Sequence, residues 1–363
     1  MAAVAETFGV EEEYHLVDPD DHRLAPRPEL SERALRSVAG SRLKPEMLTS
    51  QLEAASEVCT SLTDLPDELA GMRAQAAAAA AEVGAVLLAT STHPFAPVSE
   101  IDIMARDRYD VLLDRFGVVV RQLNLCGCHV HVSVPDLDTA VRVTTGSRPY
   151  LPVLAAMTAS SPYHEGVDTG YDSFRLAQLA LWPQGGSPPE LASGASYTAA
   201  VAELVRIGLV EDAGAVLWEV RPSARYPTVE FRIADVCPDA CDAVLYTGIV
   251  RSLSRTIASR AEGPRISDTA LRAARWQASR YGLGGRLWSP LRGRSVTAQD
   301  AVADLMTELR PDLEQHGEWD LVSRLMTRLL AEGNSATRQR RIVRDGGDVR
   351  AVAAAAVRLT AGL

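Results

Sequence analysis

The segment from Cys126 to Val134, CGCHVHVSV, carries two histidines at alternate positions. Side chains alternate between the two faces of a β-strand, so His129, His131 and Ser133 would point to one side. The cysteines and valines of the segment would point to the other side and pack against apolar residues. Two imidazoles on one strand face favour a functional site over two buried structural histidines, because no other polar side chain of the segment explains them.

Three other segments show the same alternation, with carboxylates or a guanidinium on one face. They are GVEEEYHLVD (9–18) with Glu11 and Glu13, QLEAASEV (51–58) with Glu53 and Glu57, and TVEFRIA (228–234) with Glu230 and Arg232. Side by side in one sheet, the four segments would form a basin lined by several glutamates, one or two histidines and an arginine.

Such a basin suits oxygen-preferring Mg²⁺ or Mn²⁺ better than zinc, which prefers fewer ligands and more cysteine or histidine. Arg232 follows the acidic Glu230 by two residues on the same face and could clamp a phosphate group. Metal ions and an arginine beside a nucleotide are the groups that typically catalyse phosphoryl transfer. Walker, kinase and Rossmann glycine motifs are missing from the sequence, so the metals and a sheet face would have to hold the nucleotide.

Simpler readings exist for each motif taken alone. Cys126 and Cys128 could join the histidines in a zinc site only if a bulge at Gly127 turned them to the same face. Residues 11–13 could be a solvated acidic edge strand, and residues 230–232 an exposed ion pair. His15 and His93 are expected to be structural.

Composition limits the function further. The chain of 363 residues has a net charge of −10, which argues against a nucleic-acid-binding surface. The opening MAAVAETFGVEEE lacks the features of a signal peptide, and no apolar run approaches the length of a membrane span. Five cysteines in such a chain are expected to be reduced thiols. We therefore expect a cytoplasmic protein without a membrane partner.

The elements that must position these residues follow from periodicity, proline and glycine. Strands are expected over 11–17, 48–59, 86–92, 216–221 and 228–236, in addition to the histidine segment, and helices over 28–38, 63–85, 102–123, 149–161 and 195–207. Residues 163–189, rich in Gly, Pro and Asp, are expected to form a long functional or lid-like loop. From Asp239 onward the pattern is almost entirely helical.

These elements predict an α+β fold, with helices packed outside a mostly antiparallel sheet and a helical C-terminal third. Neither a repeat nor a composition shift marks a second domain. We therefore expect residues 1–363 to form one domain, with a sheet-bearing core over 1–237 and a helical part over 238–363.

The motifs also resemble a known family. GVEEEYHLVD, LEAASEVC, THPF, CGCHVHVSVP, WEVRPSARYPTVEFRIADVC (218–237) and RYGL around Tyr281 occur in the order found in the bacterial carboxylate-amine ligases, also called glutamate-cysteine ligase type 2. The resemblance implies an ATP-dependent ligase whose funnel-shaped antiparallel sheet is similar to that of glutamine synthetase. It also implies two or three Mg²⁺ ions between the nucleotide and the amino acid.

The resemblance assigns roles to individual residues. The expected metal ligands are Glu11, Glu13, Glu53, His129 and Glu230; the expected ATP contacts are Arg232, Arg221, Arg338 and Arg340; the expected substrate contacts are Arg175, His131 and Glu219. Arg232, Glu53 and Glu57 are the expected catalytic residues, with Glu57 or Glu219 as acceptor of the amine proton. Glu219 stands where the family's WDxRP motif has Asp, and Ser133 stands where the family usually has Gly. These differences leave the identity of the substrate open.

The implied reaction has two steps. A carboxylate, expected to be that of glutamate, attacks the γ-phosphate of ATP, and cysteine or another small amine then displaces phosphate to form an amide. Two alternatives are a phosphotransferase built on the same type of sheet and an ATP-binding homologue without catalysis. The helical surfaces of the C-terminal third could form a homodimer.

Overall fold

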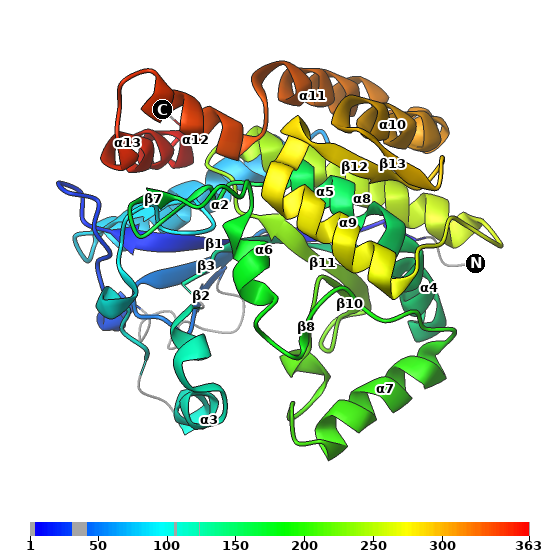
Figure 1. Cartoon of the computed structure of the whole chain (residues 1–363), viewed down its shortest axis with the longest axis horizontal. Helices are drawn as coiled ribbons and strands as arrows, with labels where there is room; N and C mark the ends of the chain where they lie inside the picture. Colours follow the sequence, from blue (N-terminus) through cyan, green and yellow to red (C-terminus); the bar gives the residue numbers. More distant parts are fainter. Residues whose placement is uncertain (1–3, 31–41, 105–106, 123, 363) are drawn as a thin grey trace.

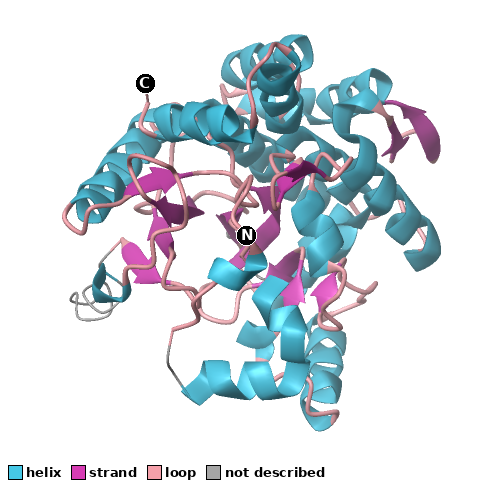
Figure 2. Ribbon diagram, turned by 60° about the vertical axis from the view of Figure 1, so that its left-hand side comes forward, coloured by secondary structure: helices cyan, strands magenta, loops and turns pink. Residues whose placement is uncertain are grey.

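A seven-stranded sheet with helices packed around it organises the computed structural model, which describes residues 4–30, 42–104, 107–122 and 124–362 (Figure 1). Helices α5, α8, α9 and α10 form layers on one side of the sheet, and α3 and α7 lie on the other side (Figure 1). Figure 2 shows the strands in the middle of the molecule, with helices on several sides. The α+β class expected from the sequence is confirmed.

The strands of the main sheet are β1 (Phe8–Val17), β2 (Leu43–Pro45), β3 (Gln51–Ala55), β4 (Val86–Leu88), β5 (Gly127–Ser133), β10 (Val220–Pro222) and β11 (Thr228–Asp235). They pair in the order β10-β11-β5-β1-β3-β2, with β4 paired to the last residues of β1, and every pairing is antiparallel. The long β1 is therefore the central strand against which β3, β4 and β5 are aligned.

The register of these pairings brings the polar faces of distant segments together. Glu11 of β1 lies opposite His129 of β5, and Glu13 lies opposite Glu53 of β3. On the other edge of β5, His131 lies opposite Glu230. Because side chains directly opposite one another share a face, the four expected segments form one polar surface.

The opposite face of the sheet is the core. Val130, Val132 and Phe231 are fully buried there, in a cluster that also includes side chains of α2, α5, α8, α10 and α11. Each such side chain contributes about 1.5–3 kcal/mol when removed from water. Since one apolar cluster joins residues before and after position 237, it supports the single-domain organisation, which stays a prediction.

The helices have the following bounds. They are α2 (Leu65–Ala81), α3 (Asp107–Phe116), α4 (Leu137–Ser147), α5 (Leu151–Thr158), α6 (Phe174–Leu179), α7 (Gly194–Arg206), α8 (Ala240–Ser259), α9 (Asp268–Tyr281), α10 (Ala298–Gln315), α11 (Trp319–Glu332), α12 (Ser335–Arg344) and α13 (Val349–Thr360). Short 3₁₀ helices are η1 (Val98–Glu100), η2 (Gly117–Gln122), η3 (Arg148–Tyr150), η4 (Ala213–Ala215) and η5 (Gly282–Gly284). The expected helix over 28–38 lies mostly outside the described residues.

Some expectations about individual segments were wrong. The strand expected over 48–59 is only Gln51–Ala55 long. Residues 163–189 are not one loop, since they contain the hairpin β6 (Tyr163–His164) and β7 (Val167–Asp168), helix α6, and β8 (Gly185–Gly186), which pairs with β9 (Leu217–Trp218). The C-terminal third is mainly helical, as expected, and also includes a hairpin of β12 (Arg286–Ser289) and β13 (Arg294–Thr297). Short strands such as these carry too few residues for a periodic pattern.

A buried ion pair attaches the back of β1 to α2. Glu12 is 0% exposed and accepts hydrogen bonds from Arg73 Nε at 2.8 Å and Arg73 Nη2 at 2.6 Å. Tyr14 Oη donates a third hydrogen bond to Glu12 at 2.6 Å. Arg73 also donates to the carbonyl groups of Cys237 and Pro238, which follow β11. The pair thus fixes the central strand, α2 and the end of β11 relative to one another.

We expect Arg73→Met to lower the free energy of unfolding by about 3–5 kcal/mol, because it leaves the Glu12 carboxylate buried without its cation. Urea unfolding of the two proteins measures the difference. Arg23→Ala is the control, since Arg23 pairs with Glu100 at the surface and such a pair contributes about 1 kcal/mol or less. Equal losses in the two variants would contradict the role given to Arg73.

His93 predicts a pH dependence of stability. The side chain is buried, which lowers the pKa of His93 to about 4, and Nδ1 accepts a hydrogen bond from the Ala96 N–H at 2.8 Å. The unfolded chain takes up this proton near pH 6.5, so the stabilisation is present above that pH and is lost as the pH falls towards 4.

Between pH 7 and pH 5 we expect the His93→Gln variant to lose about 2 kcal/mol less stability than the unaltered protein. Urea unfolding at both pH values gives the comparison, and equal losses would show that His93 does not cause the dependence.

Candidate active site

Two clusters of potential metal ligands lie on the polar face of the sheet. The first consists of Glu11, His131 and Glu230, whose ligand atoms lie within 4.8 Å of one another. Strands β1, β5 and β11 each contribute one of these residues, because their register aligns them. A hydrogen bond of 2.9 Å between His131 Nδ1 and Thr228 Oγ1 orients the imidazole, so that Nε2 faces Glu11 Oε2 at 3.6 Å.

The second cluster consists of Glu13, Glu46 and Glu53, again with ligand atoms within 4.8 Å. The sequence reading included two of these residues and missed Glu46. Glu46 follows the three-residue strand β2, and a strand of that length gives no alternation from which the orientation of the next side chain could be read. Its proximity to the others depends on the pairing of β2 with β3.

Lys44 joins the two clusters. Its Nζ atom lies 2.7 Å from Glu11 Oε1 and 2.7 Å from Glu53 Oε1. One ammonium group therefore lies between a carboxylate of the first cluster and a carboxylate of the second. The two clusters are therefore adjacent, and the ammonium group of Lys44 partly neutralises their negative charge.

The electrostatics of the second cluster also favour a cation. Burial, followed by repulsion from Glu53, raises the pKa of Glu13 to about 7. Burial and neighbouring carboxylates likewise raise the pKa of Glu46 and the pKa of Glu53. Two unit charges about 4 Å apart repel by roughly 4 kcal/mol at an effective dielectric constant near 20, and a divalent cation would remove this cost.

Glu11 of the first cluster and the neighbouring His129 favour metal binding in a different way. Although burial opposes ionisation, hydrogen bonding to His129 and His131 and the charge of Lys44 lower the pKa of Glu11. Burial, and then the positive charge of Arg232, lower the pKa of His129 to about 3. A charged carboxylate and a neutral imidazole are the forms in which these groups bind Mg²⁺ or Mn²⁺.

Arg232 lies at the centre of the basin. Its guanidinium pairs with Glu230 and lies 3.4 Å from His129 Nδ1. Arg221, on the neighbouring strand, pairs with the other oxygen of Glu230 through Nε at 2.8 Å. Arg221 also donates to the backbone carbonyl groups of Gly214 and Val216, so it positions Glu230 and does not extend into the basin.

Arg175 marks the end of the basin near Glu13. From the first turn of α6 it donates to the carbonyl group of Arg232 at 2.9 Å and lies 3.7 Å from Asp235. The charge of Arg175 lowers the pKa of Glu13 and thereby opposes the effect of burial. His131 marks the opposite end, near Thr228. The basin therefore has two different ends, with the clusters between them.

Four expected site residues lie away from the clusters. Glu57 follows the end of β3, is 69% exposed and pairs with Arg42, because the strand ends at Ala55 and the shared face ends with it. Glu219 is buried, and its two carboxylate oxygens accept from Arg275 and Ser187, neither of which belongs to the two clusters.

The C-terminal arginines also contact other groups. Arg338 pairs with Asp242 at the start of α8 and donates to the carbonyl group of Gly333. Arg340 pairs with Asp168 and Asp172. Neither of these arginines contacts a residue of the two clusters in the part of the chain that the structure describes.

The cysteines of the histidine segment lie on the core side. Cys126 and Cys128 are buried on the face opposite the histidines, within the apolar cluster. Burial raises the pKa of both thiols well above the usual range. Since β5 is continuous through this region, the zinc arrangement that would need a bulge at Gly127 does not form.

Known proteins match nearly the whole length of this chain. A family model described as "Glutamate-cysteine ligase family 2(GCS2)" matches residues 7–355. The chain is 43% identical, over 353 residues, to a Salinispora arenicola protein named "Putative glutamate--cysteine ligase 2"; the match covers 95% of this chain and 93% of that protein.

Two solved structures have the same fold. The crystal structure of a glutamate–cysteine ligase from Francisella tularensis in complex with AMP superposes with a TM-score of 0.70 at 14% identity and covers 98% of this chain and 89% of that chain. A bifunctional glutathione synthetase from Pasteurella multocida gives a TM-score of 0.72 at 15% identity and covers 98% of this chain. The present chain spans 52% of that synthetase, about half its length.

Among the described residues, none of the helices is both long and apolar enough to cross a membrane.

We expect Glu46→Gln to weaken Mn²⁺ binding by about tenfold or more, because it removes one of three clustered carboxylate charges. Titration with Mn²⁺, followed by electron paramagnetic resonance of the free ion, measures the affinity. Glu57→Gln is the matched control and should bind Mn²⁺ as the unaltered protein does. Equal affinities for all three proteins would exclude the second cluster as a metal site.

Proposed function

The chain belongs to glutamate-cysteine ligase family 2, and on that premise we propose that it joins the carboxylate of glutamate to a small amine with consumption of ATP. ATP-dependent carboxylate-amine ligation is the activity of the family. Glutamate as donor and cysteine or another small amine as acceptor are our proposal, and so is a cytoplasmic location.

The observation that carries this proposal is the pair of adjacent carboxylate-rich clusters beside Arg232. Glu11, His131 and Glu230 would hold one Mg²⁺, while Glu13, Glu46 and Glu53 would hold a second. His129 lies next to both clusters, 3.8 Å from Glu11 and 3.9 Å from Glu13, and would complete either set. When bound, the two cations would offset the repulsion between ATP and a carboxylate substrate.

Arg232 is positioned to bind the phosphoryl group that is transferred. It is held between Glu230 and His129, so little conformational entropy is lost when it meets a phosphate. In the first step a carboxylate oxygen of glutamate attacks the γ-phosphorus and ADP leaves with the bridging oxygen. The guanidinium would stabilise the charge on the equatorial oxygens during this transfer.

The second step needs an amine to attack the acyl carbon and displace inorganic phosphate, with loss of one proton from the amine. We place both amino-acid substrates at the Glu13 end, where Arg175 offers a positive charge, and the nucleotide at the His131 end. We do not assign the amine proton to Glu57 or Glu219, because Glu57 is exposed outside the basin and Glu219 is buried against Arg275 and Ser187, away from the two clusters.

We expect ADP and phosphate release from MgATP to require glutamate and one particular amine, with a product whose mass is that of the two substrates less one water. A coupled assay with a panel of amines that includes cysteine, read beside product mass spectrometry, identifies the acceptor. A phosphorylated product formed without any amine would instead establish a phosphotransferase.

Arg232→Gln should lower kcat by about 100-fold or more, since it removes charge stabilisation that acts in the transition state. Arg206→Gln, an exposed substitution on α7, is the control for an arginine distant from the basin. If the two variants turned over ATP at the same rate, Arg232 would have no part in the transfer.

A further inference from the structure

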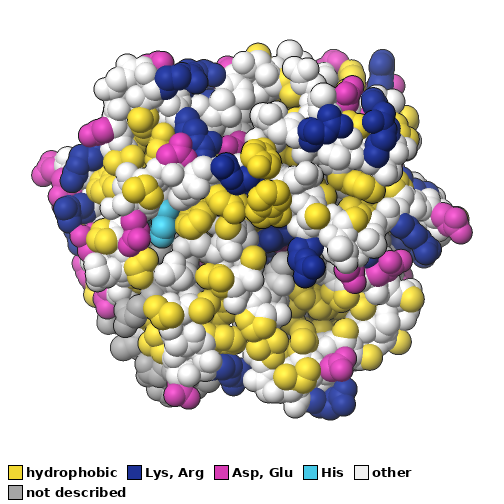
Figure 3. All heavy atoms as spheres, viewed as in Figure 1, with side chains coloured by type: hydrophobic (Ala, Val, Ile, Leu, Met, Phe, Trp, Pro, Cys, Tyr) yellow, Lys and Arg dark blue, Asp and Glu magenta, His cyan; other side chains and the backbone are white. Residues whose placement is uncertain are grey.

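Lys44 is the only lysine in the chain, although the sequence contains 37 lysine and arginine residues. Side chains of these two types are scattered over the face that Figure 3 shows, and in the whole chain all of them except Lys44 are arginines. The single lysine lies in β2, between the two carboxylate clusters of the basin. The use of lysine at this one position indicates a task that an arginine would not perform.

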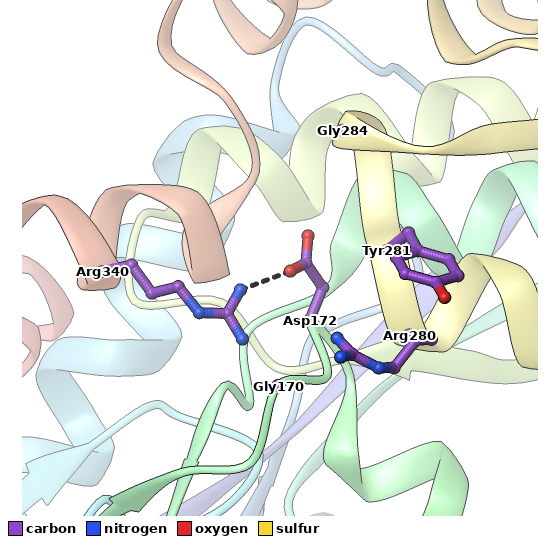
Figure 4. Close-up of a pocket in the computed structure, with 6 residues that line it drawn as sticks. All are labelled: Gly170, Asp172, Arg280, Tyr281, Gly284 and Arg340. Atoms are coloured by element: carbon purple, nitrogen blue, oxygen red, sulfur yellow. Dashed lines mark hydrogen bonds and ion pairs between the residues drawn. The ribbon is translucent and has the colours of Figure 1, made fainter.

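Arginine forms the fixed ion pairs of this molecule. Its planar guanidinium can donate two parallel hydrogen bonds to a carboxylate and hold it in one geometry. Arg73 binds both oxygens of the buried Glu12 in this way. Figure 4 shows another fixed pair, in which the Arg340 guanidinium is directed at the Asp172 carboxylate. An ammonium group is a compact charge on a flexible stem without this directional fit, so it exchanges its partners more readily.

The contacts of Lys44 with the two clusters are unequal. Nζ donates a hydrogen bond of 2.7 Å to Glu11 Oε1. It also lies 2.7 Å from Glu53 Oε1 but not in hydrogen-bond geometry, so this buried oxygen accepts no hydrogen bond from any described residue. A buried carboxylate oxygen without a hydrogen bond is costly. The ammonium group therefore neutralises Glu53 without satisfying it, whereas a metal ion ligated by that oxygen would do both.

A divalent cation and Lys44 compete for these carboxylates. Glu11 belongs to the first cluster and Glu53 to the second, so an ion in either cluster would share a carboxylate with Nζ. Because Mg²⁺ lies about 2.1 Å from its oxygen ligands, an ion on the oxygen that contacts Nζ would be within about 5 Å of the ammonium group. A divalent ion repels the ammonium group twice as strongly as a single charge at that distance. Metal binding therefore favours the removal of Lys44.

The position of Lys44 gives its side chain a way out of the basin. Strand β2 lies at the edge of the main sheet, where β3 is its one partner among the described strands. The Lys44 side chain is 38% exposed, whereas those of Glu11 and Glu53 are 15% and 10% exposed. The ammonium group can therefore reach solvent by rotation about its side-chain bonds, without a change in the sheet or in the apolar core.

We propose that Lys44 is an exchangeable internal cation. In the metal-free protein its ammonium group offsets the charge of Glu11 and Glu53, and a divalent cation that binds to the clusters displaces it towards solvent. The inference rests on the proposed function only in taking the two clusters as metal sites. Lys44 thus keeps the basin intact when no metal is bound, and it lowers the metal affinity that the carboxylates alone would give.

Nuclear magnetic resonance of the full chain tests the displacement, because a single lysine gives a single side-chain signal. Lysine with an isotope label at Cε is incorporated during expression, and Lys44→Arg identifies the signal by its loss. We expect a broad, shifted signal without metal and a narrow signal close to that of free lysine at saturating Mg²⁺, since the released side chain rotates freely. A signal that keeps its width and position at saturating Mg²⁺ would overturn the proposal. This measurement uses the unaltered protein, so it does not depend on the folding of a variant.

Mn²⁺ affinity, measured by electron paramagnetic resonance of the free ion, gives a second test. Lys44→Met removes the competing charge and should bind Mn²⁺ about tenfold or more tightly than the unaltered protein does. Lys44→Arg, which keeps a positive charge, should show no such gain. Arg42→Met is the matched control, because Arg42 is two residues away and pairs with Glu57 and Glu68 outside the clusters. Its Mn²⁺ affinity should be unchanged.

The temperature of unfolding compares the metal-free and metal-bound states. Without metal, Lys44→Met should unfold at a lower temperature than the unaltered protein, and Mn²⁺ should raise the unfolding temperature more in the variant. Equal Mn²⁺ affinities of Lys44→Met and the unaltered protein would overturn the exchange and leave the proposed function intact. Failure of the unaltered protein to bind Mn²⁺ saturably would overturn both.

Discussion

Like-charge repulsion among carboxylates is the constraint on which the site depends. Five glutamates, two in one cluster and three in the other, meet on one face of the sheet. The chain offsets their charge with Lys44 between the clusters and with Arg232 and Arg221 on Glu230. A fold that concentrates negative charge in this way gains stability from bound cations, so binding of Mg²⁺ and the integrity of the basin would be coupled.

The other face of the same strands supplies the rigidity that this arrangement needs. Val130, Val132 and Phe231 bury the back of β5 and β11 against helices from both parts of the chain. Beneath β1, the Glu12–Arg73 pair links the sheet to α2 and to the residues after β11. Because a shift of register by one residue would exchange the two faces, this packing fixes which side chains enter the basin.

The two ends of the basin differ in ways that suit two kinds of substrate. One end has His131 with Thr228, and the other has Arg175 with Glu13. The basin therefore has chemically different ends on either side of the two carboxylate clusters.

Alternation within each strand was readable from the sequence alone. Side chains repeat with a period of two along a strand. This period alone places three pairs of residues on a shared face: His129 with His131, Glu11 with Glu13, and Glu230 with Arg232. The same pattern separated the cysteines from the histidines, and the order of the expected strands and helices predicted the α+β class. Ordered motifs also identified the family.

Only the tertiary structure decided which of these residues meet. Strand pairing is non-local, so it alone brought Glu46 beside Glu53, placed Lys44 between the clusters and left Glu57 outside them. Arg340 was expected at the nucleotide and instead lines a pocket with Arg280, because α12 packs against the loop before α6. The position of a residue along its strand determines the face on which its side chain lies. Which other side chains lie beside it depends on contacts between segments far apart in the chain.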